Sequence, residues 1–153
     1  MLGGRINDRI RAYTYLYPEA DQDMDAFWVS AEMAADAAHA CVERGYTAVK
    51  FDTGGPYTVG VGRQPTLREF AGSAEFCAAI RDAVGDRADL LFGTHGQFNA
   101  AGALRLAEKL RLYSPAWYEE PVAPDDWAGL ARGCAGTSLP VAVGERLTTK
   151  AEF

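Results

Sequence analysis

The sequence predicts an α/β protein that forms the N-terminal half of a TIM-type (β/α) barrel, with about five parallel strands and intervening helices over residues 1–153. Short apolar runs alternate with longer stretches in which apolar residues recur at helical spacing. Strands that alternate with helices pair in parallel through right-handed crossovers. Three runs end at Gly93, Glu119 and Glu145, and each of these residues lies 26 positions from the next. That spacing is typical of barrel strands that each present a side chain at a common mouth.

The individual elements follow from local signals along the chain. Pro18 stops the first strand, and Gly45 and Gly85 are suited to end the first two helices. Asn99 and Asp125 are suited to cap the last two helices. In chain order these signals predict strand 10–17, helix 30–44, strand 46–51, a Gly/Pro-rich loop at 53–65, helix 66–84, strand 90–92, helix 99–112, strand 115–118, helix 125–133, strand 140–143 and a further helix start at Thr148.

The composition excludes several classes of function. Of the 153 residues 48% are hydrophobic, which suffices for a core, and the net charge is −6. No basic stripe suggests a nucleic-acid partner, and an acidic surface disfavours binding to anionic membranes. No apolar stretch approaches the roughly 20 residues of a membrane span, and no hydrophobic signal segment begins the chain, which predicts a cytoplasmic protein. The three cysteines lack C-x-x-C spacing and are expected to be reduced thiols.

The number of strands raises the question of how the sheet is completed. Five strands make about half of an eight-stranded barrel, which typically needs about 250 residues. The chain is therefore expected to be either a barrel fragment or an open, doubly wound sheet. A half barrel leaves two sheet edges open. It is also expected to leave inner-face side chains without partners, namely Tyr15, Val49, Leu91, Tyr118 and Val143. We therefore expect self-association or a homo-oligomer.

Two glutamates are suited to a metal ion. Glu119 and Glu145 each follow a buried-looking run at a strand end, where neighbouring carboxylates can share a hard divalent cation such as Mg²⁺. The alternative is that these residues, together with Glu120, form surface ion pairs. Gly93 has no side chain at the third position of the same spacing, so the ligand set is incomplete.

Other side chains near the strand ends are candidates for catalysis and substrate binding. His95 could act as a general acid or base, replace the missing ligand, or simply be a hydrogen-bonded loop residue. Lys50 and Asp52 lie on one face of the second strand because side chains alternate. Lys50 could take a proton with a lowered pKa or hold a carboxylate substrate, and the two could also form an ion pair. Tyr15 lies in a tyrosine stripe that could line the core or contact substrate.

Five segments, taken together, resemble the enolase superfamily. The most similar branch is the mandelate racemase / muconate lactonizing enzyme group, particularly its sugar-acid dehydratases. The segments follow in order over nearly the whole chain, as LGGR at 2–5, AVK at 48–50, HGQ at 95–97, WYEEP at 117–121 and GERL at 144–147. The resemblance implies a Mg²⁺-assisted reaction on a small carboxylate such as a sugar acid. A base removes the proton α to the carboxylate, the metal stabilises the enediolate, and in dehydratases an acid helps the β-hydroxyl leave.

The resemblance also implies roles for individual residues. Glu119 and Glu145 match the second and third metal ligands. His95 matches a histidine that is the general acid in some dehydratases, and Lys50 matches the first lysine of the strand-two motif. Asp52 stands where racemases place the catalytic lysine.

The remaining site residues concern the incomplete ligand set and the substrate. Gly93 stands where the family has its first metal-binding aspartate, and His95, Gln97 or water could fill the gap. Asp52, Gln97 and Tyr15 are the candidate substrate-binding residues.

The leading hypothesis is a piece of a Mg²⁺-dependent sugar-acid dehydratase. The capping domain and the C-terminal half of the barrel, which in the family carries the His–Asp base, are expected to lie outside these 153 residues. We therefore expect little or no turnover by this chain alone. The alternatives are a racemase or cycloisomerase of the same superfamily, which Asp52 disfavours, and a non-catalytic fragment or pseudoenzyme, which Gly93 favours.

Overall fold

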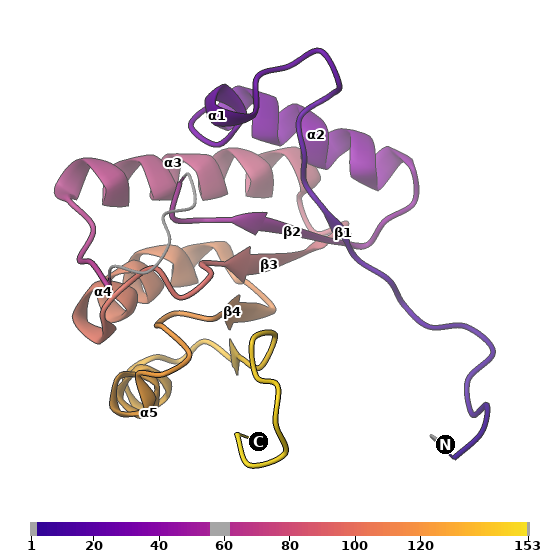
Figure 1. Cartoon of the computed structure of the whole chain (residues 1–153). Coiled ribbons are helices and arrows are strands. Elements are labelled where there is room, and N and C mark those ends of the chain that lie inside the picture. Colours follow the sequence, from indigo (N-terminus) through magenta and orange to yellow (C-terminus); the bar gives the residue numbers. More distant parts are fainter. Residues whose placement is uncertain (1–2, 56–61, 153) are drawn as a thin grey trace.

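The computed structural model describes residues 3–55 and 62–152, and its centre is one sheet of five parallel strands in the order β1-β2-β3-β4-β5 (Figure 1). The strands are β1 (Thr14–Tyr15), β2 (Ala48–Asp52), β3 (Asp89–Gly93), β4 (Trp117–Glu119) and β5 (Val141–Ala142). The helices are α1 (Met24–Phe27), α2 (Ala31–Glu43), α3 (Leu67–Val84), α4 (Ala100–Leu110), the 3₁₀ helix η1 (Arg111–Tyr113) and α5 (Trp127–Gly136).

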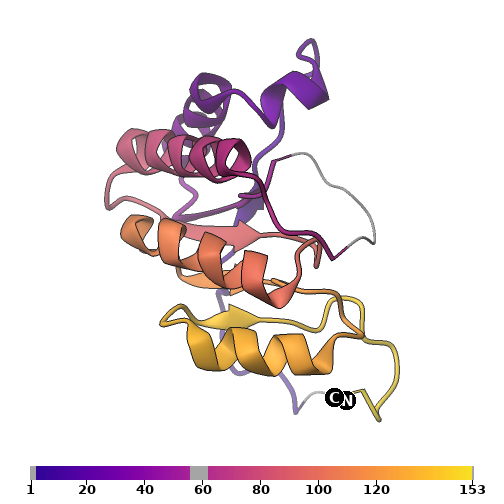
Figure 2. The same cartoon turned by 90° about the vertical axis from the view of Figure 1, so that its left-hand side faces the viewer.

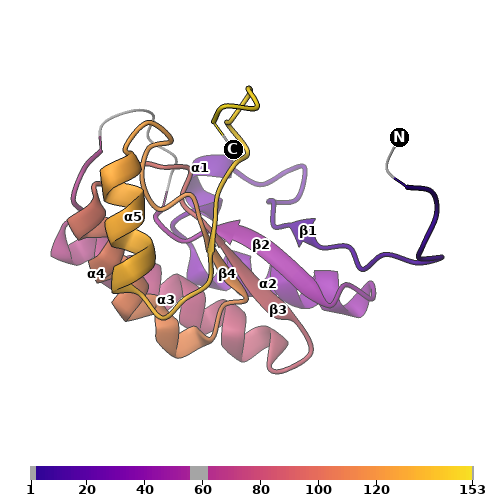
Figure 3. The same cartoon turned by 90° about the horizontal axis from the view of Figure 1, so that it is seen from below.

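The arrangement of the helices confirms the barrel prediction. Figures 2 and 3 show α2, α3, α4 and α5 in a column over one face of the sheet. A doubly wound sheet has helices on both faces and a reversal of strand order. Here the strand order is sequential and one face carries the helices, as in the wall of a barrel. The doubly wound alternative is therefore wrong.

Side-chain caps set most of the helix ends where the sequence predicts them. The hydroxyl of Ser30 accepts from the backbone of α2, and Asn99 does the same for α4. Thr66 forms a capping box with Glu69 at the start of α3, in which each side chain accepts from the other's backbone N–H. For α5 the prediction of Asp125 was wrong by one residue. The carboxylate of Asp126 accepts from Gly129 and begins that helix.

The structure differs from the sequence prediction at three other places. The first strand is only two residues long, because pairing with β2 is limited to Thr14 and Tyr15, and Ile10 is 85% exposed. Helix α1 was not predicted, since its four residues are too few for a periodic pattern. At the predicted helix start the structure has a turn over residues 150–152, where the carboxylate of Glu152 accepts from the N–H groups of Thr148 and Thr149, and the described part of the chain ends there. Much of the predicted loop over 53–65 falls at residues 56–61, outside the described part of the chain.

Alternation along the strands sorts side chains between two faces. In β2, Val49 and Phe51 are buried in the core between sheet and helices, and the Phe51 ring lies against Phe76 of α3. Tyr118 of β4 also points to the helices, where its hydroxyl donates to the carbonyl of Ala103 in α4. The prediction that Val49 and Tyr118 belong to the inner face was therefore wrong. Because side chains alternate along a strand, the residues that face inward are Lys50 on β2 and Glu119 on β4.

Of the other residues predicted to face inward, Leu91 is only 2% exposed and Tyr15 is half-buried. The prediction for Val143 was wrong, because Ala142 pairs with the inward-facing Glu119 and side chains alternate along the strand. The three cysteines are free thiols, as predicted. Among the described residues, no helix combines the length and the apolar composition that a bilayer crossing requires.

Candidate functional site

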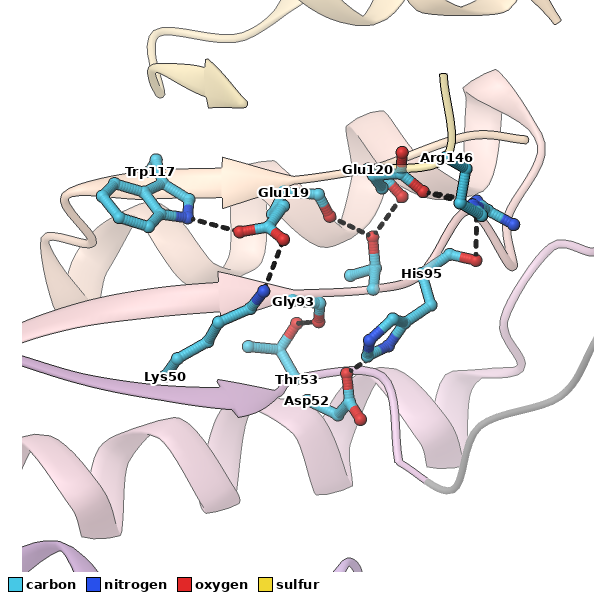
Figure 4. A network of polar contacts seen from close by, with 10 residues as sticks. Lys50, Asp52, Thr53, Gly93, His95, Trp117, Glu119, Glu120 and Arg146 are labelled. Carbon is cyan, nitrogen blue, oxygen red and sulfur yellow. Dashed lines mark hydrogen bonds and ion pairs between the residues drawn. The ribbon is translucent and has the colours of Figure 1, made fainter. Parts of the chain in front are cut away.

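The strand register brings the predicted site residues into two adjacent rows on the inner face. At the carboxyl ends of the strands, Asp52 pairs with Gly93 and Gly93 pairs with Glu119. One pleat earlier, Lys50 lies between Tyr15 and Leu91 in the same register. Partners in register on parallel strands point to the same face. Figure 4 shows the polar side chains of both rows converging at this edge of the sheet.

Lys50 and Glu119 form a buried ion pair across the sheet. Nζ of Lys50 donates to Oε1 of Glu119, and Nε1 of Trp117 donates to Oε2 of the same carboxylate at 2.8 Å (Figure 4). The ring centroid of Tyr15 lies 5.7 Å from Nζ. Both oxygens of Glu119 are thus held by N–H donors, and the ammonium is the cation in contact with this carboxylate.

The protonation state of Lys50 follows from these contacts. Burial has the largest effect and lowers the pKa of Lys50, but the hydrogen bond and charge of Glu119 together outweigh it, so the pKa is raised. Lys50 is therefore a cation at neutral pH. The prediction of a lowered pKa was wrong, and so was the alternative of an ion pair with Asp52, because Lys50 pairs with Glu119 instead.

Asp52 pairs with His95. Nδ1 of His95 lies 2.8 Å from Oδ1 of Asp52, and the side chain of His95 is 27% exposed while that of Asp52 is 8% exposed. The hydrogen bond with Asp52 raises the pKa of His95, burial lowers it, and the charge of Asp52 raises it further, with a net rise. Burial and then the charge of Asp52 raise the pKa of Tyr15, whose hydroxyl keeps its proton.

A second ion pair, between Arg146 and Glu120, lies beside His95. The sequence analysis considered an ion pair for Glu120 but did not name its partner. Nε of Arg146 donates to Oε2 of Glu120 at 2.6 Å, and Nη2 donates to the backbone carbonyl of His95 at 3.1 Å (Figure 4). Glu120 does form an ion pair, but it is only 3% exposed, so the expectation of a surface pair was wrong. Thr94 is fully buried, and its hydroxyl donates to the carbonyl of Glu120 at 2.7 Å.

Sequence reasoning missed Trp117, Thr94 and Arg146 as members of this network. Trp117 and Arg146 each lie next to or near a predicted ligand in the sequence, which is the signal that could have identified them. Thr94 gives no such signal. Its hydroxyl donates to the backbone carbonyls of Glu119 and Glu120, which come close to it only in the folded sheet.

Gln97 and Glu145 lie at the margins of this network. Gln97 is 1% exposed, and its amide lies against Gly54, where an added Cβ would come within 2.8 Å of Nε2. Glu145 follows β5 and is exposed, and its charge raises the pKa of both Lys50 and His95. The structure thus brings Lys50 to Glu119 and Asp52 to His95, while Gln97 and Glu145 lie outside these pairs.

The sequence model of the family described as "Enolase C-terminal domain-like" matches residues 32–153. The chain belongs to this family. The resemblance drawn from the five motifs is thereby confirmed. Among solved structures, the chain is similar to a mandelate racemase/muconate lactonizing enzyme from Jannaschia sp. CCS1. The two are 62% identical with a TM-score of 0.91, over 99% of this chain and 39% of that one.

Two curated relatives of this family member are dehydratases. The chain is 36% identical over 152 residues to the D-gluconate dehydratase of Thermoproteus tenax, covering 99% of this chain and 28% of that protein. It is 32% identical over 153 residues to the D-xylonate dehydratase of Haloferax volcanii, covering 98% of this chain and 36% of that protein. The chain therefore spans only about a third of the length of these relatives, whose names describe sugar-acid dehydratases.

Two side chains suit the Mg²⁺ ion that the enolase superfamily implies. Glu119 and Glu145 are carboxylates at the ends of neighbouring strands, and Mg²⁺ is usually bound through one or two carboxylates with water and substrate oxygens. Gly93 adds no ligand, since an added Cβ there would lie 3.1 Å from Oδ1 of Asp52. Within the described part of the chain, no three His, Cys, Asp or Glu side chains are grouped to hold a metal. Glu119 and Glu145 are thus ligands of the type that Mg²⁺ takes, while both oxygens of Glu119 accept from N–H donors in this structure.

Proposed function

We propose that this chain forms the metal-binding and proton-donating side of the active site of a Mg²⁺-dependent sugar-acid dehydratase. The observation that carries the proposal is the inner-face row in which Glu119 lies two strands from the Asp52–His95 pair. The names of the two curated relatives, a D-gluconate dehydratase and a D-xylonate dehydratase, support a sugar acid as the substrate class. The substrate is then a small carboxylate with a hydroxyl on the β-carbon.

Glu119 and Glu145 would hold the Mg²⁺ ion in this proposal. When bound, the cation supplies the positive charge that stabilises the substrate dianion formed as the α-proton leaves. Glu119 must first exchange the ammonium of Lys50 for the cation, because that ammonium occupies one of its oxygens. We expect Mg²⁺ affinity to be reduced by this competition.

The remaining side chains bind the substrate and move a proton. Lys50 can hold the substrate carboxylate, which would replace Glu119 as the negative partner of its ammonium. The raised pKa of Tyr15 keeps its hydroxyl as a hydrogen-bond donor beside the same position. The contact with Asp52 raises the pKa of His95, which favours the protonated ring that can donate a proton to the departing hydroxyl.

The chain alone is proposed to have little or no turnover. The cationic state of Lys50 leaves it unable to remove the α-proton, and Asp52 is bound to His95. Asp52 also disfavours the racemase or cycloisomerase alternative, which needs a lysine at its position. Dehydration of D-gluconate or D-xylonate by the purified chain, abolished in Glu145→Gln, would contradict this part of the proposal.

The experiment that tests the metal site is a Mg²⁺ titration of the chain by isothermal calorimetry. We expect weak, saturable binding that is lost in Glu119→Gln and in Glu145→Gln. Glu108→Gln is the matched control, because Glu108 is an exposed glutamate in the last turn of α4 that contacts Arg111, and it should bind as the unmodified chain does.

Two results of that titration would contradict the proposal. Equal binding by all three variants would place the ion elsewhere. No binding by a chain that circular dichroism shows to be folded would favour the non-catalytic alternative, for which Gly93 in the ligand row is the supporting observation.

A further inference from the structure

The inference concerns the tryptophan that precedes Glu119 by two residues on β4, and it rests on the proposed function. Nε1 of Trp117 donates to Oε2 of Glu119 at 2.8 Å, while the ammonium of Lys50 contacts Oε1 of the same carboxylate (Figure 4). We infer that Trp117 is a positioning residue, whose indole N–H holds Oε2 so that Oε1 is the oxygen that exchanges Lys50 for a metal cation. Neither the family match nor the names of the relatives assign this task to Trp117.

The strand geometry places the indole beside the carboxylate. Trp117 and Glu119 are two residues apart on β4, so their side chains leave the same face of the sheet. Glu119 pairs in register with Gly93 of β3, and Lys50 of β2 reaches across β3 to Glu119. A side chain at position 93 would contact this lysine, because an ideal Cβ there lies 3.6 Å from Cε of Lys50. The absence of a side chain at Gly93 thus leaves a path for the ammonium.

The ring of Trp117 is held by neighbours other than Glu119. The ring of Tyr13 packs against it at a centroid distance of 5.8 Å and an interplanar angle of 81°. This edge-to-face arrangement is one that aromatic pairs favour. Leu91, the register partner of Trp117 on β3, is only 2% exposed. The indole N–H therefore points in a direction that does not depend on the carboxylate.

The backbone of Glu119 is also fixed without its side chain. Its carbonyl accepts from the N–H of Thr94 at 3.1 Å and from the hydroxyl of Thr94 at 2.9 Å. The side chain of Glu119 is 14% exposed, so water has little access to it. The rotation of the carboxylate is therefore set by its two N–H donors, Trp117 and Lys50.

The two donors respond differently to a cation. The indole is a neutral donor, and its ring cannot leave Oε2 without losing the contact with Tyr13. The ammonium of Lys50 is a charge on a flexible stem, and a second cation at the same carboxylate repels it. Exchange at Glu119 therefore takes place at Oε1, while the bond from Trp117 to Oε2 stays. Loss of a hydrogen bond that orients a metal ligand typically lowers metal affinity by about ten- to a hundredfold.

The first test is nitrogen–proton NMR of the indole groups, without metal. The sequence contains three tryptophans, Trp28, Trp117 and Trp127, so each indole N–H can be assigned by substitution with phenylalanine. In Glu119→Gln, we expect the Trp117 indole proton to move upfield and to exchange faster with solvent. Glutamine offers one oxygen where glutamate offers two, so Lys50 and Trp117 would compete for it. A bond to a neutral oxygen is also weaker than a bond to a carboxylate.

The second test is Mg²⁺ binding by Trp117→Phe, measured by calorimetry. Phenylalanine retains an aromatic ring beside Tyr13 and lacks the N–H donor. We expect binding weaker by about tenfold, because the carboxylate of Glu119 can then turn both oxygens toward Lys50. Trp127→Phe is the matched control, since Trp127 is 54% exposed at the start of α5. It should leave both Mg²⁺ binding and the Trp117 resonance unchanged.

Two results would overturn the inference. One is an unchanged Trp117 indole resonance in folded Glu119→Gln, a measurement that leaves Trp117 intact and involves no metal. The other is Mg²⁺ binding by folded Trp117→Phe that equals or exceeds binding by the unmodified chain. Failure of the proposed function is distinguishable from both. An unmodified chain that binds no Mg²⁺, while its Trp117 resonance responds to Glu119→Gln, would contradict the metal site and still support the positioning of Glu119 by Trp117.

Discussion

Asp52 and Glu119 are acidic residues in the same inner-face row, yet their environments differ. The carboxylate of Glu119 accepts from two donors, the ammonium of Lys50 and the indole N–H of Trp117, and the ammonium neutralises its negative charge. Asp52 contacts the one titratable side chain of the site whose charge changes near neutral pH, that of His95. The two carboxylates have different partners because Lys50 lies one pleat before Asp52 on β2, and from there its long side chain reaches Glu119. Each carboxylate therefore has a separate task in the proposed reaction.

At the same scale, Gly96→Ala should destabilise the chain by more than about 1 kcal/mol. Gly96 has φ of +65°, and an added Cβ would lie 2.2 Å from Nη2 of Arg146, so that the guanidinium would have to leave its contacts. The measurement is urea unfolding of the substituted and unmodified chains.

The matched control for that substitution is Gly45→Ala. Gly45 also has a positive φ, +94°, but an added Cβ there meets nothing within 4 Å, so only backbone strain remains. Equal losses of unfolding free energy in the two variants would show that the Arg146 contact adds nothing to stability.

At the scale of elements, the helix caps and the strand alternation decide where the site residues lie. Helix α3 packs against α2 and supports β2, whose inner face carries both Lys50 and Asp52. A shift of β2 by one residue would send these two side chains into the apolar core and turn Val49 and Phe51 outward. The apolar residues that pack against the helices therefore also hold the polar pairs at the mouth.

The capping box of α3 gives the prediction at this scale. Thr66→Ala should lower the unfolding free energy by about 1 kcal/mol, because the N–H of Glu69 loses its acceptor at the helix start. Thr66→Ser keeps the hydroxyl and should recover most of the loss. Thermal unfolding followed by circular dichroism measures both, and equal melting of Thr66→Ala and the unmodified chain would show that the cap contributes nothing.

At the scale of the whole molecule, the sheet has one face covered by helices and one face that the described helices leave open. The inner face carries the buried polar pairs, and at its rim it exposes Tyr13 and Tyr17 by about half of their surface each. The strands β1 and β5 are the edges of the sheet. Apolar side chains beside open strand edges favour association. We therefore propose that this chain self-associates through its inner face.

Sedimentation velocity over a range of concentrations tests that proposal. Tyr13→Glu should shift the chain toward monomer, since Tyr13 lies against the inward-facing Trp117 and a charge there would be buried at the interface. Val29→Glu is the control, because Val29 is 70% exposed but lies between α1 and α2, and it should leave association unchanged. A chain that is monomeric at all concentrations would show the inner face to be stable without a partner surface.

The sequence was enough to predict the order of the main strands and helices, a parallel sheet, and a set of polar candidate site residues at the strand ends. These depend on local signals, such as the helix cap at Asn99 and the 26-residue spacing of Glu119 and Glu145, which can be recognised without knowledge of the fold. Pairing was decided only by the tertiary structure. Lys50 contacts Glu119 rather than Asp52 because strand register, which no local signal specifies, sets which side chains meet. Burial of Glu120 by Arg146 likewise needs two strand ends that are remote in sequence.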